Sequence, residues 1–394
     1  MTQLLLALIY LAFISLGLPD SLLGSGWPSM YPAFGVPISY AGVISTICAV
    51  GTVVSSILSD RLTRRLGTGK IMVLSVGMTA LALFGFSVSR SFLMLCLWSV
   101  PYGLGAGSVD AALNNYVALH FKSRHMNWLH CMWGVGASLS PYVMGYALTS
   151  GRGWSMGYRY ISVLQIVLTV ILLFSLPLWK KRGGEKTSAS PETNHPVPEK
   201  ALSIKQVLNI PGAKEIFVAF FCECALESTT GLWSSSFLVL ERGLTPEAAA
   251  RFVSLFFLGI TVGRAVSGFL SIAVSDVNMT RLGQGLIFLG ICVFILPGSE
   301  IPANIGLILI GLGCAPIYPS IVHSTPANFG ADKSQAVIGI QMACAYMGSC
   351  FAPPLFGLIA QYVHIALFPV FLLLILAVMA LTHEMTVRKV RKAR

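Results

Sequence analysis

The stretch PYGLGAGSVDAALNN, residues 101–115, lies inside an apolar run that extends from about residue 92 to residue 119. A run of this length can cross a membrane as a helix, and Asp110 stands near its middle. A carboxylate at that depth costs roughly 2.5–3.5 kcal/mol on insertion scales, so intramembrane acids usually face protein or water and have a function. We therefore expect Asp110 to face the interior of a helical membrane protein.

Small and polar residues share one side of the predicted helix with Asp110. Asn114 follows it by four residues, while Gly107 and Gly103 precede it by three and seven residues. These spacings place the four residues on one helical face. Glycine on such a face lets another backbone or a ligand approach closely. The alternative is that the glycines serve only helix packing and that Asp110 is a neutral, hydrogen-bonded structural acid.

The composition indicates an integral membrane protein. Of the 394 residues, 55% are hydrophobic and 10% are charged, whereas soluble domains carry about 25% charged residues. The apolar runs are about 20 residues long and lack strict alternation, which predicts helices and excludes barrel strands. The amino terminus lacks a basic segment and is interpreted as a first span, not a cleaved signal. The nine cysteines fit neither a disulfide framework nor a metal site.

We predict twelve spans in two groups of six. Residues 1–179 form the predicted amino-terminal six-helix bundle, and residues 213–384 form the carboxy-terminal one. Between them lies a polar cytoplasmic linker, 180–212, with a short surface helix at 201–208, and a basic cytoplasmic tail follows at 385–394. The predicted spans are 3–27, 38–58, 70–88, 92–119, 125–149, 158–179, 213–239, 247–271, 282–298, 303–324, 334–360 and 364–383.

The distribution of Lys and Arg predicts the orientation. Loops on the side of the linker carry 20 of the 26 basic residues, the opposite loops carry 5, and Arg264 lies within a span. Cytoplasmic loops carry an excess of basic residues, so we expect both termini in the cytoplasm and the protein in the plasma (inner) membrane. The net charge of +11 is therefore interpreted as a sign of topology and not of nucleic-acid binding.

The two halves of the chain repeat in sequence. Residues 51–59, GTVVSSILS, match residues 263–271, GRAVSGFLS, at five of nine positions and at a separation of 212. The other matching positions are Gly136, Pro141 and Gly145 with Gly348, Pro353 and Gly357, also 212 apart, and Asp20 and Gly24 with Glu227 and Gly231, 207 apart. Parallel repeats of this kind predict two pseudo-symmetric six-helix bundles that face each other across a central cavity.

These features resemble the major facilitator superfamily. Its loop signature after the second span, Gly-x-x-x-Asp-Arg-x-Gly-Arg-Arg, is similar to SILSDRLTRR at 56–65, in which both glycines are substituted. The resemblance implies an all-α membrane protein of the major facilitator fold that transports by alternating access. We expect Asp60, Arg61, Arg64 and Arg65 to latch the bundles together on the cytoplasmic side.

A narrower resemblance, over about residues 100–148, is to the fucose:proton symporter type of sugar permeases. That family has a Gly-Leu-Gly run, an acidic residue and an asparagine four residues later on the fourth helix, then Asn-x-x-Gln at the start of the fifth. Asp110, Asn114, Asn127 and His130 occupy those positions, with His130 in place of the glutamine. The family's carboxylate on helix 1 falls nearer Gly24 than Asp20. The resemblance implies import of a monosaccharide, a neutral hexose first, by proton symport.

Asp110 is the first candidate for proton coupling, and three further acids are candidates as well. Asp20 lies in GLPDSLLGSGWP, 17–28, where proline and glycines predict a broken helix with free backbone groups for a ligand; capping of that break is the alternative role. Glu223 and Glu227 are one turn apart in the seventh span, and two like charges in a low dielectric cannot both ionise cheaply. At least one of them is therefore expected to be protonated near neutral pH, as a proton-coupled carrier requires.

The candidate solute-binding residues combine hydrogen-bonding groups with aromatic faces, which a sugar requires. They are Asp20, Glu227, Asn114, Asn127, His130, Gln341, Tyr318, Trp27, Trp133, Trp233 and Tyr346. Core packing or a position at the membrane interface is the alternative for each tryptophan. Arg264 is the one basic residue well inside a span, where a structural ion pair is favoured over an anion site.

No catalytic or nucleotide-binding motif is present, so the sequence predicts a transporter and not an enzyme. We expect H⁺ as the coupling ion, with Na⁺ as the alternative, and neither cofactor nor metal. The expected partners are a small-molecule solute and the lipid bilayer, and a monomer is expected. Two alternatives stay open: an exporter or permease for another small organic molecule, and, less favoured, a membrane receptor or enzyme without transport.

Overall fold

The structure, a computed structural model, describes residues 2–120, 123–180, 204–297 and 300–393. The described part is almost entirely helical and contains no strand. Its long helices are α1 (Thr2–Asp20), α2 (Leu22–Phe34), α3 (Tyr40–Leu66), α4 (Thr68–Val88), α5 (Phe92–His120), α6 (Ser123–Thr149), α7 (Gly153–Lys180), α9 (Ala213–Leu240), α10 (Pro246–Leu270), α11 (Asp276–Ile295), α12 (Glu300–Phe329), α13 (Ala331–Ile359) and α14 (Phe368–Ala393). The short elements are α8 (Ile204–Leu208), η1 (Ala360–His364) and η2 (Ile365–Leu367).

Within the described residues, 9 stretches are long and apolar enough to cross a membrane. Leu4–Phe34 joins α1 and α2 in one stretch, and Ala336–Lys392 joins α13 and α14 in another. When α1 and α2 are kept as one span, α13 and α14 are counted separately, and α3 and α6 are included, all twelve predicted spans are represented by helices. The observed helices α2, α3 and α14 extend furthest beyond the predicted ends.

The first span is interrupted near its middle, where the sequence predicts a break. α1 ends at Asp20 and α2 begins at Leu22, and Pro19 lies in the last turn of α1. Proline lacks a backbone N–H and disturbs the preceding turn. Ser21, between the two helices, donates its hydroxyl to the carbonyl of Ala137 in α6 at 2.7 Å. The interruption therefore places the Asp20 side chain at a helix end that is tied to α6.

Equivalent helix crossings occur in both halves. Gly136 of α6 lies against the backbone of α1 at Ile14, and Gly348 of α13 lies against the backbone of α9 at Phe221. In both places a side chain would overlap a carbonyl oxygen, so glycine is required for the helices to approach this closely. The two glycines are 212 positions apart and their partners are 207 apart, which are the two separations found in the sequence. The sequence repeat is therefore a repeat of helix packing.

The helix α10 begins with an extra turn that its counterpart α3 lacks. Its cap is Thr245, whose hydroxyl accepts a hydrogen bond from the backbone N–H of Ala248 at 3.3 Å, and Pro246 stands at the first helical position. Both are typical signals of a helix start. At the separation of 212, the first residue of α3, Tyr40, corresponds to Phe252. Residues 247–251 therefore correspond to the non-helical residues 35–39 between α2 and α3.

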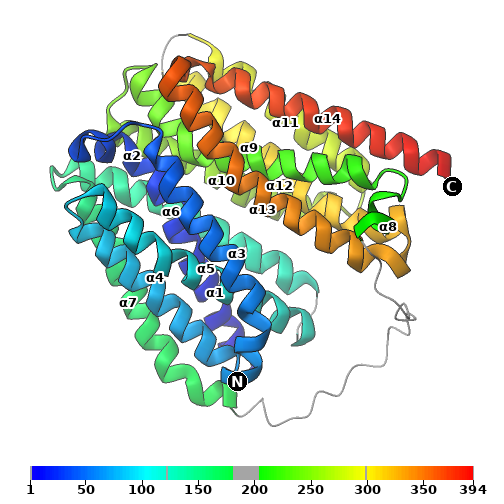
Figure 1. Ribbon diagram of the computed structural model, residues 1–394, viewed down its shortest axis with the longest axis horizontal. Helices are drawn as coiled ribbons and strands as arrows, with labels where there is room; N and C mark the ends of the chain where they lie inside the picture. The colour runs from blue at the N-terminus through cyan, green and yellow to red at the C-terminus, as the bar shows by residue number, and fades with distance from the viewer. Residues whose placement is uncertain (1, 121–122, 181–203, 298–299, 394) are drawn as a thin grey trace.

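The two halves meet at one end and separate toward the other. We call the end where α7 finishes and α9 begins the linker end, and the opposite end the far end. Toward the far end, Gly24 of α2 lies against the carbonyl of Gly231 in α9, so two glycines related by the repeat meet each other. The helices of the two halves diverge toward the linker end, where the N-terminus and α8 lie (Figure 1).

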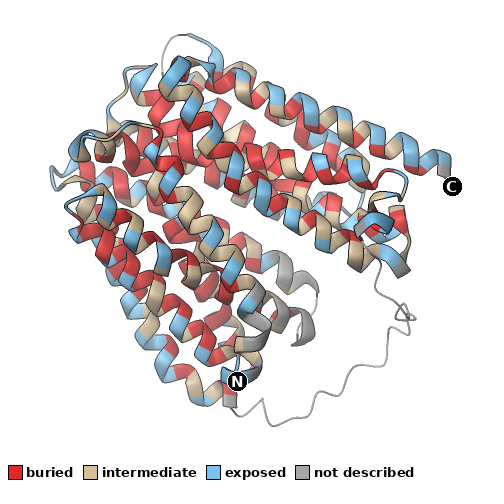
Figure 2. Cartoon of the chain, in the orientation of Figure 1, coloured by how far each residue is buried: buried red, intermediate tan, exposed pale blue. Residues whose placement is uncertain are grey.

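Exposed apolar side chains cover the outer helix faces. Phe174, Phe269 and Leu374 are 79%, 75% and 62% exposed, respectively, whereas buried residues gather between the helices (Figure 2). Soluble monomers rarely expose large contiguous apolar patches, but in a bilayer such faces contact acyl chains. The surface thus agrees with a multi-pass membrane protein.

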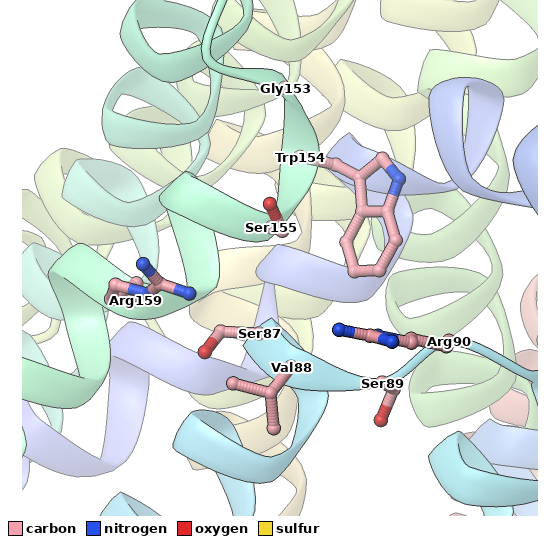
Figure 3. A pocket seen from close by; sticks show the side chains of 8 residues that line it. All are labelled: Ser87, Val88, Ser89, Arg90, Gly153, Trp154, Ser155 and Arg159. Atoms are coloured by element: carbon pink, nitrogen blue, oxygen red, sulfur yellow. The ribbon is translucent and has the colours of Figure 1, made fainter.

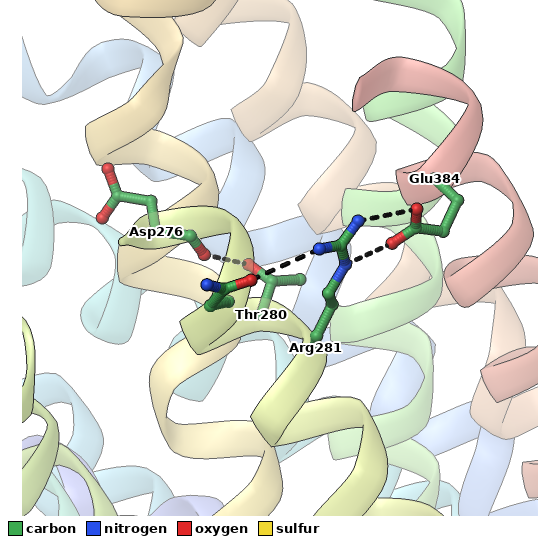
Figure 4. Close-up of polar contacts among 5 residues, drawn as sticks. Asp276, Thr280, Arg281 and Glu384 are labelled. Atoms are coloured by element: carbon green, nitrogen blue, oxygen red, sulfur yellow. Dashed lines mark hydrogen bonds and ion pairs between the residues drawn. The ribbon is translucent and has the colours of Figure 1, made fainter. Parts of the chain in front are cut away.

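Ion pairs fix the last helix at the linker end. Arg281 of α11 donates two hydrogen bonds to Glu384 of α14, from Nε to Oε1 at 2.6 Å and from Nη2 to Oε2 at 2.9 Å (Figure 4). Lys389 binds Glu215 of α9 at 2.6 Å. Residues 385–393 of the predicted basic tail continue α14 as a helix. Most of the predicted linker lies outside the described residues, so the domain boundaries stay a prediction.

Candidate functional site

Asp20 accepts hydrogen bonds from two neutral donors. The hydroxyl of Tyr102 on α5 donates to Oδ1 at 2.8 Å, and Nε1 of Trp133 on α6 donates to Oδ2 at 2.8 Å. Asp20 lies about halfway along the apolar stretch Leu4–Phe34, and yet its side chain is exposed. Its two hydrogen-bond partners belong to other helices of the same half. The carboxylate is thus held in position and open to a ligand.

Arg264 of α10 approaches the same tryptophan from the second half. Its Cζ atom lies 5.0 Å from the centroid of the Trp133 ring, which is cation–π geometry. Nη2 of Arg264 lies 3.8 Å from Oε1 of Glu227 on α9. Asp20, Trp133, Arg264 and Glu227 therefore form a continuous set of polar contacts from one half to the other, which we call the polar bridge.

Glu223 lies one turn before Glu227 on α9, but in a different environment. It is fully buried, and neither carboxyl oxygen has a hydrogen-bond partner among the described residues. The side chain of Glu227 is 20% exposed. An ionised Glu223 would be an uncompensated buried charge, which is strongly unfavourable. A proton on Glu223 would remove this cost, and the proton-coupling role of the two acids stays a prediction.

Asp110 and Asn114 form a pair within α5. Nδ2 of Asn114 donates to Oδ1 of Asp110 at 2.9 Å and to its backbone carbonyl at 3.0 Å. Gly103 and Gly107 lie against the backbone of α3, so they serve helix packing, one of the two roles expected of them. Asp110 lies within electrostatic range of Asp20. The acid that stands out in the sequence is therefore a neighbour of the polar bridge and not a member of it.

Two predicted aromatic platforms are core residues. Trp27 and Trp233 are fully buried. Their indole N–H groups donate to the carbonyls of Ile38 at 2.7 Å and Pro353 at 2.8 Å. A ring without an accessible face cannot bind a solute in this conformation. The structure therefore differs from the solute-binding prediction and shows the packing role that was its alternative.

Three predicted residues of the second half lie on α12 and α13. Gln341 is fully buried and accepts a hydrogen bond from the hydroxyl of Thr325 at 3.1 Å, so in this conformation it is closed to a solute. Tyr318 donates to Sδ of Met342 at 3.1 Å and is partly buried. Tyr346 is 40% exposed. Of the three, Tyr346 presents the most open side chain.

The remaining predicted residues lie toward the linker end. The ring of His130 packs edge-on against Phe13, with centroids 5.9 Å apart, and its carbonyl accepts a long hydrogen bond of 3.5 Å from Arg264. Arg65 is exposed. The roles predicted for the following residues stay predictions, because their side chains lie outside the described part: Asn127, Asp60, Arg61 and Arg64.

Sequence reasoning misses Tyr102 and Thr261. Tyr102 stands eight residues before Asp110, about two helical turns away, and a phenol within a glycine-rich helix was the available signal. The hydroxyl of Thr261 on α10 lies 3.3 Å from that of Ser138 on α6, beside the close approach of Gly134. No sequence pattern pairs these two helices, so the contact could not be predicted.

A separate depression of about 380 Å³ lies at the far end (Figure 3). Its walls come from the end of α4 and the start of α7, with the connection after α4, and its lining residues are Ser87, Val88, Ser89, Arg90, Gly153, Trp154, Ser155 and Arg159. None of the predicted site residues lines it. The polar bridge is therefore the candidate site, and the depression is not part of it.

Comparison with known proteins decides the family. The family model of the Major Facilitator Superfamily matches residues 9–353. The chain belongs to this superfamily. A crystal structure of a mutant of the peptide transporter POT superposes on it with a TM-score of 0.75 at 14% identity, covering 98% of this chain and 95% of the other. The all-α membrane fold with two related halves, expected from the sequence, is thereby confirmed.

Three relatives show similarity over most of their lengths. The chain is 22% identical to Bypass of stop codon protein 6 of Saccharomyces cerevisiae, over 94% of this chain and 79% of that protein. It is 21% identical to the cis,cis-muconate transport protein of Acinetobacter baylyi, over 89% and 86%. It is 22% identical to the glucose/mannose transporter GlcP of Bacillus subtilis, over 79% and 77%. Family membership makes the protein a membrane transporter of a small molecule.

Proposed function

We propose that the protein imports a small polar solute by proton symport, with alternating access to a site at the polar bridge. The observation that carries the proposal is the bridge itself, in which Asp20 and Trp133 of one half meet Arg264 and Glu227 of the other. A proton or solute that changes the charge at either carboxylate changes the attraction between the halves. Such a differential interaction is what shifts a transporter between two conformations.

Two solute classes have support. The likeness of Asp110, Asn114 and Asn127 to the residues of a sugar permease, together with a relative named as a glucose/mannose transporter, supports a monosaccharide. The relative named as a cis,cis-muconate transport protein supports an organic acid as the second candidate. The observation that favours the second class is a guanidinium group at the site, that of Arg264.

The proposed orientation places the linker end in the cytoplasm of the cell, with the protein a monomer in the plasma membrane. It rests on the excess of Lys and Arg in the loops at that end. In this orientation the two halves diverge toward the cytoplasm, and we expect the solute to enter or leave the polar bridge on that side. Contact of the halves at the far end then closes the site toward the outside.

Uptake into proteoliposomes tests the proposal. The purified full-length protein is given labelled hexoses and organic acids under an inward proton gradient, an inward Na⁺ gradient or no gradient. We expect accumulation of one solute that requires the proton gradient and is abolished by a protonophore. Accumulation that follows the Na⁺ gradient alone, or that proceeds equally without any gradient, would contradict proton symport.

A further inference from the structure

We propose that the transported solute carries a carboxylate group, and that Arg264 is the residue that binds it. This inference deepens the proposed function and rests on it, because it names the solute class of the same site. It departs from the expectation that Arg264 serves only in a structural ion pair. A hydroxylated organic acid of monosaccharide size, such as a hexuronate, fits both the guanidinium group and the surrounding hydrogen-bonding groups.

The guanidinium of Arg264 has unused donors. It carries five N–H groups, and its side chain is 17% exposed. Among the described residues, its one hydrogen bond is the 3.5 Å contact with the carbonyl of His130. The nearest carboxylate oxygen, Oε1 of Glu227, lies at 3.8 Å, beyond hydrogen-bond distance. None of its nitrogens is among the enclosed atoms that lack a partner in the described part of the chain, so its free donors face accessible space and can bind an acceptor.

Arg264 and Glu227 can be compared with an arginine–carboxylate pair of good hydrogen-bond geometry elsewhere in the same structure. Arg281 and Glu384 form a two-pronged pair with N···O distances of 2.6 and 2.9 Å, although both side chains are more exposed than those of Arg264 and Glu227. A fork of this kind is the favourable geometry for an arginine and a carboxylate. The loose contact of Arg264 therefore does not have the form of a structural pair, and it leaves the fork open for a second carboxylate.

The neighbours of Arg264 suit the rest of such a solute. The Trp133 ring lies beside the guanidinium and can contact the C–H face of a sugar or an alkene chain. The exposed carboxylate of Asp20 can accept hydrogen bonds from hydroxyl groups. Arg264 would thus fix the acid group, while the other members of the polar bridge would contact the uncharged part of the solute.

Carboxylate binding is coupled to a proton in this arrangement. A solute carboxylate on Arg264 competes with Glu227 for the same cation, and Glu227 then binds H⁺, since its negative charge has lost its counter-charge. The titratable and charged groups around Glu227 are Glu223 and Cys224 on its own helix, Arg264 on α10 and Cys314 on α12. Arg264 is the one cation among them. Each carboxylate would therefore bind together with one proton.

Matched pairs of solutes test the inference directly. The thermal unfolding of the purified full-length protein is measured with glucose against glucuronate and galactose against galacturonate, which differ in a single carboxylate, and with cis,cis-muconate. We expect at least one carboxylate to raise Tm while its neutral partner does not. Arg264→Lys keeps the positive charge but loses the fork, and should weaken that binding about 10-fold or more. Arg281→Gln is the matched control and should bind like the wild type.

Glu227→Gln provides a second readout, which a purely structural role would not move. This variant resembles the protonated acid, so it should bind the carboxylate at all pH values. In the wild type, affinity should instead increase as the pH falls, by up to about tenfold per pH unit while one proton is taken up. Equal pH dependence in the two proteins would contradict the coupling between Arg264 and Glu227.

The outcomes separate this inference from the proposed function. A neutral hexose that is accumulated by the proton gradient, and that stabilises the wild type and Arg264→Lys equally, overturns the carboxylate inference and leaves symport standing. A carboxylate that binds through Arg264 but is transported without regard to the proton gradient supports the inference and overturns symport. A panel in which no carboxylate raises the Tm of the wild type overturns the inference.

Discussion

Asp20 and Glu227 occupy corresponding places in the two halves, 207 positions apart, but they are held in opposite ways. Asp20 accepts two hydrogen bonds of 2.8 Å from neutral donors. Glu227 has a cation at 3.8 Å, and its partner makes no hydrogen bond to it. The first carboxylate is fixed by geometry, and the second is balanced by a charge. The comparison teaches that a symmetric scaffold can carry asymmetric chemistry.

The difference arises from a few side chains on equivalent positions. At the separation of 212, the donors Tyr102 and Trp133 correspond to Cys314 and Ala345, which cannot replace them. In the other direction, Arg264 corresponds to Thr52. Each half therefore lacks the partner that the other half supplies to its acid. This difference suits a division of roles between the halves, in which Asp20 of the first half positions the solute and Arg264 and Glu227 of the second half respond to its charge.

The largest expected effect comes from breaking the scaffold that both halves share. Gly136→Val and Gly348→Val each push a side chain into a neighbouring backbone, and overpacking of this kind costs about 1–3 kcal/mol or more. We expect both variants to lose most of the folded protein, measured as monodisperse yield and Tm. Gly339→Ala, where nothing lies within 4 Å of the added atom, is the control. A normal yield for one of the two valine variants would show that the crossings are not equivalent.

The next effect concerns the acid of the first half. Asp20→Asn removes the charge and turns an N–H group toward one of its two donors, Tyr102 or Trp133. Hydrogen bonds to a charged group contribute about 1.5–3 kcal/mol each, so we expect proton-driven accumulation in proteoliposomes to fall by about 100-fold. By contrast, the corresponding variant of the second half, Glu227→Gln, should still exchange solute across the membrane. Wild-type accumulation by Asp20→Asn would remove Asp20 from the site.

A smaller effect is expected when one donor to Asp20 is removed. Trp133→Phe keeps an aromatic ring beside Arg264 but deletes the indole N–H, so roughly a tenfold loss of transport rate or affinity should follow. Initial uptake rates measured over a range of solute concentrations would show it. Trp128→Phe, at a position 51% exposed on the same helix, serves as the control. An equal loss in both variants would mean that the hydrogen bond from Trp133 to Asp20 is not the cause of the loss.

The smallest effect should come from the exposed pair at the linker end. Arg281→Gln removes the fork to Glu384, and exposed ion pairs contribute about 0–1 kcal/mol. We expect a slight decrease in Tm and unchanged uptake. A large loss of transport with intact folding would assign Arg281 a role in the transport cycle and would weaken its use as a control.

The spans and the repeat were predictable because both are local properties of the sequence. Apolar length marks a membrane helix, and glycines at constant separation mark equivalent crossings such as those of Gly136 and Gly348. The site was only partly predictable, because its pairs join distant segments. Trp27 and Trp133 look alike in sequence, but one is buried in the core and the other lies at the polar bridge. The helix rotation that separates them is set by packing, which no local pattern records.

The extra turn at the start of α10 makes the far end unequal on its two sides. Glu247 and Arg251 of this turn lie against Gly145 of α6. The corresponding glycine of α13 is Gly357, and it lies near Ser39, which directly precedes α3. Six added residues lengthen a helix by about 9 Å. If the two halves separate at the far end, the shorter contact between α3 and α13 should break before the longer contact between α6 and α10. The contact between α6 and α10 would then be the last to break at the far end.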